Sequence, residues 1–150
     1  MSLAERLEAD LKASLKAREA GKVRLATLRM VKAAVKNREI ELRHPLDEAG
    51  IIDVIAREIK QRREALPDYQ RSGRSELIAN LEAEIAILEE YLPPALSPAE
   101  LDNLITTTIA EVGAAGPSDL GKVMTALMPR VKGRADGKEV NRRVQEKLRG

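Results

Sequence analysis

The stretch LPPALSP, residues 92–98, sets the domain organisation of this sequence, because it separates two regions of helical pattern. Three of its seven residues are prolines, which lack the backbone N–H that a helix interior needs. Ser97 and Glu100 then have the spacing of a capping box, with Pro98 at the first helical position. We therefore expect an N-terminal domain over residues 1–92, a linker over residues 93–97 and a small C-terminal domain over residues 98–150.

The N-terminal region begins with two helical patterns. Leucines recur every four residues over positions 3–15, and Gly21 then predicts the end of a first helix. A second helix is expected over about residues 22–43, because the residue before Pro45 disfavours helical backbone. The apolar side of this second helix consists of Leu28, Val31, Val35 and Leu42.

A predicted break separates two further helices in the same region. Asp47 is the expected N-cap of the third helix, whose apolar side contains Ile52, Ile55, Ile59 and Leu66. The stretch LPDYQRSGR, residues 66–74, contains proline and glycine and is predicted to interrupt the helix, with at most one short turn of its own. The fourth helix is expected over residues 75–92, with an apolar stripe of Leu77, Leu81, Ile85 and Leu88.

The C-terminal region predicts three short helices. The first is expected over residues 98–112, and the second over about residues 118–127. The third is expected over about residues 137–148, where Asp136 and Glu139 have capping-box spacing. No segment has the alternation of a strand, so the predicted fold is all-α, with about four helices followed by three.

Composition excludes several classes of protein. The chain has 150 residues, no cysteine, no Phe or Trp and two tyrosines, Tyr69 and Tyr91. Cysteine-based catalysis, disulfides and thiolate metal sites are therefore excluded, and stacking of single-stranded bases on aromatic rings is disfavoured. We expect a cytoplasmic protein, because the absence of cysteine fits a reducing compartment. We expect no membrane partner, because no apolar run has the roughly 18 residues of a membrane span.

One basic segment lies in the second predicted helix. Lys22, Arg29, Lys36 and Arg43 recur at intervals of seven residues, within a segment of seven basic and two acidic residues. Such a stripe is suited to phosphates along an RNA strand. The alternative, weighed equally, is neutralisation by a neighbouring helix that contains Glu82, Glu84, Glu89 and Glu90. Arg57, Lys60, Arg62 and Arg63 extend the possible basic surface.

A second basic segment, residues 128–145, contains six basic and two acidic residues. A phosphate-binding P-loop is excluded, because three residues separate Gly133 from Gly137 where the motif needs four, and Glu139 occupies the position of the required Ser or Thr. Composition alone favours an ordinary solvated surface over an anion-binding site here.

Catalysis has little support in the sequence. His44 is the only histidine and lies beside Pro45 in a predicted turn. No Ser–His–Asp arrangement or histidine-rich metal site is present. We therefore predict no catalytic residue, no metal ligand and no cofactor.

Several motifs resemble the YqeY family, whose members are free-standing relatives of the C-terminal tail of the B subunit of aspartyl/glutamyl-tRNA amidotransferase. These motifs are LRMVKAAVKNREIE, EIKQRRE, SGRSELI, LEEYLPPALS and GKVMTALMPRVKGRADGKEVNRRV, and the similarity covers about residues 3–148. The resemblance implies a helical N-terminal part and a three-helix C-terminal part. It also implies a tRNA-binding arm. The family label of carbon–nitrogen ligase with glutamine as amido-N-donor has no matching catalytic motif in these residues.

The resulting hypothesis is a non-catalytic, tRNA-binding or tRNA-related accessory module, with an amidotransferase or an aminoacyl-tRNA synthetase as a further partner. The alternatives are a protein-interaction adaptor and an amidotransferase in its own right. The residues predicted to contact nucleic acid are Arg29, Lys36, Lys122, Lys132, Arg134, Lys138 and Arg142.

Overall fold

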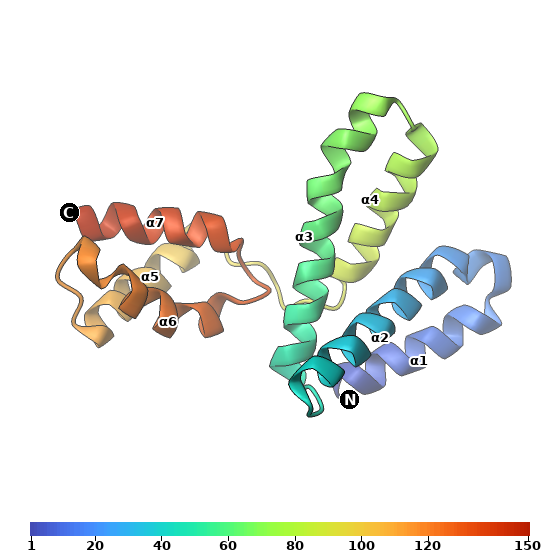
Figure 1. The fold of residues 1–150 in the computed structure, drawn as a ribbon, viewed down its shortest axis with the longest axis horizontal. Coiled ribbons are helices and arrows are strands. Elements are labelled where there is room, and N and C mark those ends of the chain that lie inside the picture. The colour runs from blue at the N-terminus through green and yellow to red at the C-terminus, as the bar shows by residue number, and fades with distance from the viewer. The chain divides into compact units, whose positions relative to one another are not determined.

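The computed structural model describes residues 1–150 and consists of seven α-helices and two short 3-10 helices (Figure 1). It contains no strand, so the prediction of an all-α fold is confirmed. The chain divides into two compact units, Met1–Leu92 and Pro93–Gly150. We call them unit 1 and unit 2 and describe each by itself.

Unit 1 is built from two helical hairpins. The first contains α1 (Leu3–Lys16), a 3-10 turn (Arg18–Gly21) and α2 (Lys22–Leu42). The second contains α3 (Glu48–Ser72) and α4 (Ser75–Glu89). Figure 1 shows that the hairpins meet where α2 approaches α3 and α4, and that their connecting turns point apart.

Aliphatic side chains from all four helices form the core of unit 1, together with Tyr91. Leu28 and Val31 contribute from α2, Ile55 and Ile59 from α3, and Leu88 from α4. The predicted cap of α3 is present, since Asp47 accepts a hydrogen bond from the Gly50 N–H at 2.8 Å. Two hairpins on one shared core leave the opposite side of α2 open to solvent.

The turn between α1 and α2 depends on Gly21. A Cβ atom at this position would lie 2.3 Å from the carbonyl oxygen of Ser14. Ser14 is itself buried, so its backbone has no room to retreat. Gly21 therefore has a packing role in this turn, beyond the helix-stop role expected from its residue type.

The predicted break over residues 66–74 is wrong, because α3 continues through Pro67 and ends at Ser72. Pro67 is exposed, so the carbonyl group that it leaves unbonded four residues earlier can be hydrated. Leu66 meanwhile packs against the core and holds the helix in place. The residue that terminates α3 is its C-cap, Gly73, which has a left-handed φ of +70°.

Unit 2 is a three-helix bundle formed by α5 (Pro98–Val112), α6 (Leu120–Val131) and α7 (Gly137–Arg149), with a 3-10 turn (Pro117–Asp119) before α6. Its core contains Ile105, Val123, Leu127, Val140 and Val144, all fully buried. The predicted caps are present: Ser97 Oγ accepts from the Glu100 N–H at 3.1 Å, and Asp136 accepts from the Glu139 N–H at 3.3 Å. The second helix is longer than predicted, because α6 continues through the exposed Pro129 to the buried Val131.

Three leucines of the predicted apolar patterns are substantially exposed, and one of them is Leu15 at 48%. Leu42 and Leu77 are 38% and 42% exposed. Leu42 is the last residue of α2, and Leu77 is near the start of α4 beside the α3–α4 turn. Helical spacing was correct there, but the neighbouring helices do not extend far enough to cover these positions.

Candidate nucleic-acid interface

Four basic residues of α2 form an exposed row without ion pairs. Lys22, Arg29, Lys36 and Arg43 are all exposed, and none of them forms a salt bridge. We call these four residues the α2 basic row. Arg43 directly follows the helix and adopts a left-handed conformation with φ +61°.

The remaining basic residues of α2 are neutralised. Arg24 pairs with Glu90 at 2.8 Å, Lys32 with Glu8 at 3.2 Å, and Arg38 with Glu41 at 3.0 Å. Paired and unpaired basic side chains are interspersed along one helix, so its composition alone could not show which of them form ion pairs.

The acidic residues of α4 do not neutralise the α2 basic row. Glu84 and Glu89 pair with Arg62 and Arg63 of α3, while Glu90 pairs with Arg24. The neutralisation hypothesis therefore holds for these three arginines and leaves the row uncompensated.

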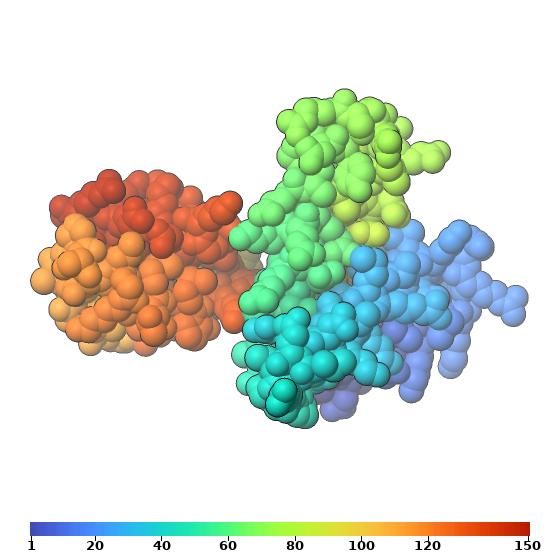
Figure 2. Space-filling model, in the orientation of Figure 1, coloured from blue at the N-terminus to red at the C-terminus, as the bar shows by residue number.

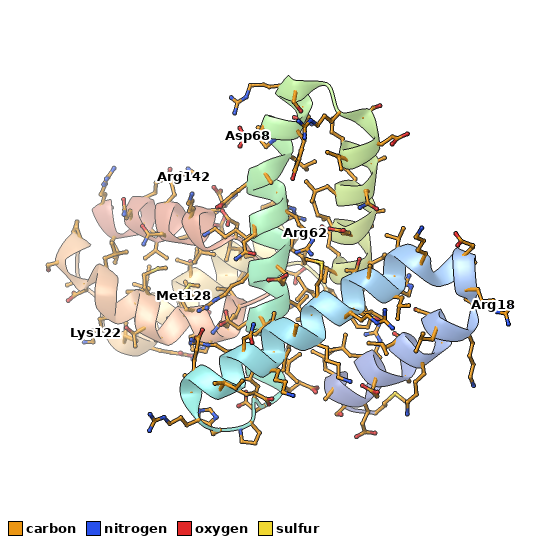
Figure 3. The ribbon with its side chains drawn as sticks, turned by 45° about the vertical axis from the view of Figure 1, so that its right-hand side comes forward. Arg18, Arg62, Asp68, Lys122, Met128 and Arg142 are labelled. Atoms are coloured by element: carbon orange, nitrogen blue, oxygen red, sulfur yellow. The ribbon has the colours of Figure 1, made fainter.

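Arg62, assigned to the possible basic surface, is buried, so that assignment is wrong. Its side chain lies between the helices of unit 1 (Figure 3), where Nε donates to Glu84 at 2.8 Å and Nη1 donates to Glu58 at 3.1 Å. Nη1 also donates to the carbonyl oxygen of Glu58 at 3.0 Å. The Glu58–Arg62 spacing of four residues signals a helical pair, but the contact with Glu84 on another helix required the fold.

In unit 2, Arg134 forms hydrogen bonds with the linker, residues 93–97. Its Nε donates to the carbonyl oxygen of Pro94 at 3.0 Å, and its own carbonyl oxygen accepts from the Leu96 N–H at 2.9 Å. Charge reversal at Arg134 would therefore disturb the linker as well as any ligand contact.

Arg142 is committed to two carboxylates on α7. It pairs with Glu139 at 2.6 Å and with Glu146 at 2.5 Å. Hydrogen bonds from Arg142 and Arg143 hold the pKa of Glu139 down at about 2. Arg143 also reaches Asp102 of α5 at 3.2 Å, so this charge cluster links two helices of unit 2.

The other three predicted contact residues of unit 2 are exposed lysines. Lys122 lies near the start of α6, Lys132 directly follows that helix, and Lys138 lies in the first turn of α7. Lys122 and Lys138 form no ion pair. Figure 3 labels Lys122 and Arg142 on different helices of the unit. The predicted residues of unit 2 are thus spread over three elements, whereas those of unit 1 form one row.

A hollow of about 390 Å³ lies beside the α1–α2 turn and is lined by Asp10, Ser14, Gly21, Arg24 and Glu90, among others. Its polar groups satisfy one another: the Tyr91 hydroxyl donates to Asp10, and Arg24 pairs with Glu90. Burial, together with the hydrogen bond to Asp10, raises the pKa of Tyr91 to about 12. A tyrosine with this pKa stays protonated at neutral pH, so the cluster acts as a structural network.

Few other side chains are of the kind that takes part in catalysis or metal binding. His44 is exposed, and its Nδ1 lies 2.8 Å from the carbonyl oxygen of Pro45. No group of three or more His, Cys, Asp or Glu residues is arranged to hold a metal ion. None of the helices combines the length and the apolar character needed to cross a membrane.

The chain matches known proteins over most of its length. The model of the Yqey-like protein family matches residues 4–148. Among curated relatives, the protein named "Altered inheritance of mitochondria protein 41, mitochondrial" from Lachancea thermotolerans is 31% identical over 75% of this chain and 60% of its own length. The protein of the same name from Kluyveromyces lactis is 31% identical over 75% of this chain and 61% of its own.

The chain therefore aligns with about three fifths of the length of these relatives. Their names place them in mitochondria, so the expected cytoplasmic location of this chain is not shown and stays a prediction. The match to the family model confirms the resemblance seen in the motifs. This chain belongs to the Yqey-like protein family.

Proposed function

We propose that this chain is a non-catalytic accessory module that binds tRNA, or another folded RNA, through phosphate contacts made by the α2 basic row. The observation that supports this proposal is the row itself: four exposed cations that lack carboxylate partners. Seven residues of helix span about 10 Å, so the row extends about 30 Å along α2. Like charges in such a row repel one another, and a polyanion relieves that repulsion.

The aromatic content supports recognition of phosphates and shape rather than of stacked bases. Tyr91 is buried at 3% exposure and Tyr69 is half-buried. Single-strand binders usually stack bases on exposed rings, whereas structured RNA is contacted mainly through its backbone and its shape. The resemblance to the amidotransferase tail supports tRNA as the RNA, with tRNA-dependent amidation as the process. The relatives' names refer to the inheritance of mitochondria and do not mention RNA.

The first test is a binding titration of the full chain with purified tRNA over a salt series, with double-stranded DNA as competitor. The charge-reversal variant Arg29→Glu/Lys36→Glu should weaken binding more than tenfold and reduce the log–log salt slope by about two, because two phosphate contacts are lost. The matched control is Lys16→Glu/Arg74→Glu, which changes the net charge equally at exposed positions of the same unit. Equal weakening by both variants would show a non-specific charge effect and would overturn the proposal.

A protein-interaction adaptor is the second candidate function, and one observation favours it. The exposed side of α2 carries the aliphatic residues Val23, Met30 and Ile40 beside the basic row, with exposures of 38%, 48% and 66%. Phosphates do not bury such side chains. The third hypothesis, an amidotransferase in its own right, predicts that the purified chain amidates misacylated tRNA with glutamine and ATP, and we expect no such activity.

A further inference from the structure

The exposed side of α2 has the residue pattern of a coiled-coil seam. Apolar or small residues recur at alternating intervals of three and four, which correspond to heptad positions a and d. Positions a are Val23, Met30 and Asn37, and positions d are Ala26, Ala33 and Ile40. All six are exposed, and we call them the α2 seam.

The α2 seam lies on the other side of its helix from Leu28 and Val31, except that the end of the Met30 side chain turns back towards α3, where Sδ accepts a hydrogen bond from Arg62 Nη2 at 3.5 Å. The core contacts of α2 come from other heptad positions: Leu28 and Val31 are 2% and 1% exposed, and Val35 packs against the same core. A helix that only covers a core has one apolar stripe. α2 has a second one, and Figure 2 shows the α2 segment, coloured blue to cyan, at the surface of unit 1.

The two edges of the seam differ. Positions g on one edge are the α2 basic row, which is exposed and unpaired. Positions e on the other edge are Thr27, Ala34 and Glu41, of which Thr27 is fully buried and Ala34 half-buried. A helix laid on the seam therefore meets charged side chains mainly on the basic edge.

We propose that the α2 seam docks one helix of a partner protein, and that this helix is amphipathic and acidic. Its apolar side would cover Val23, Met30 and Ile40, while Ala26 and Ala33 permit close approach of the two backbones. Carboxylates on the partner would pair with the α2 basic row. Asn37, at the last a position, would favour a partner with a polar residue opposite it, which sets the register.

A second copy of this chain does not fit as the occupant. In a parallel pair of α2 helices, the basic g positions would face Thr27, Ala34 and Glu41, which provide a single carboxylate. In an antiparallel pair, the basic rows would face each other. Both arrangements leave cations uncompensated, so charge complementarity selects a partner of opposite sign.

The test uses a fluorescent 21-residue peptide with Leu at positions a and d, except for Asn at its last position a, and with Glu at positions e and g. Repulsion between the glutamates opposes self-association of this peptide at neutral pH. We expect saturable binding to the full chain, with a gain in helical circular dichroism. Neither a scrambled peptide of the same composition nor the same heptads with Lys in place of Glu should bind.

The discriminating variant is Val23→Gln/Ile40→Gln, which removes two exposed aliphatic side chains without changing charge. It should weaken peptide binding by at least about tenfold, since the apolar contacts at both ends of the seam are lost. The matched control is Leu15→Gln/Leu77→Gln, at aliphatic positions of unit 1 that are 48% and 42% exposed. The control should bind the peptide like the natural sequence.

Three results would overturn the docking proposal. The scrambled acidic peptide binds as tightly as the heptad peptide, the two double variants behave alike, or Val23→Gln/Ile40→Gln loses tRNA binding while peptide binding is unchanged. The last result would make the seam part of an RNA surface. Because Arg29→Glu/Lys36→Glu should weaken binding of both ligands, the neutral seam variant alone separates failure of this inference from failure of the RNA proposal: it should weaken peptide binding and leave tRNA binding unchanged.

Discussion

The helices α2 and α7 are both rich in basic residues, but they differ in whether those residues form ion pairs with acids on the same helix. Arg142 and Arg143 of α7 are held by Glu139, which lies three and four residues before them. Arg29 of α2 has no acidic residue three or four positions away. Local spacing of acids thus explains most of the contrast.

Glu39 shows where local spacing is insufficient. It lies three residues after Lys36 and four before Arg43, so sequence predicts an ion pair with either one. Its carboxylate instead accepts a hydrogen bond from the Leu46 N–H at 2.8 Å, in the turn before α3. Because the Glu39 carboxylate is hydrogen-bonded in this turn, Lys36 and Arg43 both remain without an ion pair. Local spacing therefore overestimates the ion pairs within α2, where Glu41 pairs with Arg38 but Glu39 pairs with no basic residue.

The largest effect is expected at Arg62, which extends the comparison to a buried ion pair. Arg62→Ala should lower the free energy of unfolding of unit 1 by about 3–5 kcal/mol, because Glu58 and Glu84 would be left without their partner. Arg142→Ala in the exposed cluster of α7 should cost far less, because solvent screens the ion pairs of an exposed arginine. Chemical denaturation followed by circular dichroism measures both, and similar losses would contradict the contrast between buried and exposed pairs.

A smaller effect is expected from alanine at glycines in the two units. Gly21→Ala should destabilise the chain by about 1–3 kcal/mol, because the added Cβ would overlap the Ser14 backbone. Gly121→Ala should stabilise it by about 0.5–1 kcal/mol, since that position lies in α6 with open space around it. Thermal unfolding midpoints measure the two shifts, and the tight-turn explanation fails if both have the same sign.

Removing the Glu139 carboxylate should make the arginines of α7 more available to phosphates, as the unpaired basic residues of α2 are. Glu139→Gln removes the carboxylate that Arg142 and Arg143 share and leaves them one carboxylate each, Glu146 and Asp102, so tRNA affinity at low salt should rise a few-fold, roughly as one added phosphate contact allows. Glu76→Gln is the matched control, because it changes net charge equally at an exposed position of unit 1 that forms no ion pair. Equal gains from both variants would mean that net charge, not release of the arginines, sets the affinity.

The smallest effect is a pH dependence of stability from Glu139. Its pKa is lowered from 4.5 to about 2 in the folded chain, so its ion pairs contribute stability that is present above pH 4.5 and is lost as the pH falls towards 2. Glu139→Gln should remove this part of the acid destabilisation. The measurement compares unfolding midpoints of the two chains between pH 5 and pH 2, and parallel curves would argue against a folded-state ion pair.

Much of the fold could be read from local signals. The caps at Asp47, Ser97 and Asp136 were predicted from residue type and spacing, because a cap involves only a few neighbouring residues. The break predicted around Pro67 was wrong, and the helix predicted to end at about residue 127 continues through Pro129. Each proline lies at an exposed position of a helix that is held on both sides by packing, and local propensity does not include that packing.

The candidate site was only partly predictable. Arg29 and Lys36 were identified from their seven-residue spacing, and both are exposed on one face of α2. Arg134 and Arg142 were chosen because they lie in the basic segment 128–145, but Arg134 bonds to Pro94, forty residues away in sequence. The α2 seam was not predicted, because its apolar residues are sparse and include two alanines, and only the exposure of all six positions distinguishes them from core.

The amino-acid sequence by itself determined the all-α class, the helix caps, the family and the heptad spacing of the α2 basic row, because these depend on neighbours within a few residues. The tertiary structure decided which charged side chains form ion pairs or hydrogen bonds within the chain. Arg62 is buried with Glu84, and Glu39 turns to Leu46. Ion pairs and burial depend on distances between segments far apart along the chain, and those distances exist only once the helices have packed.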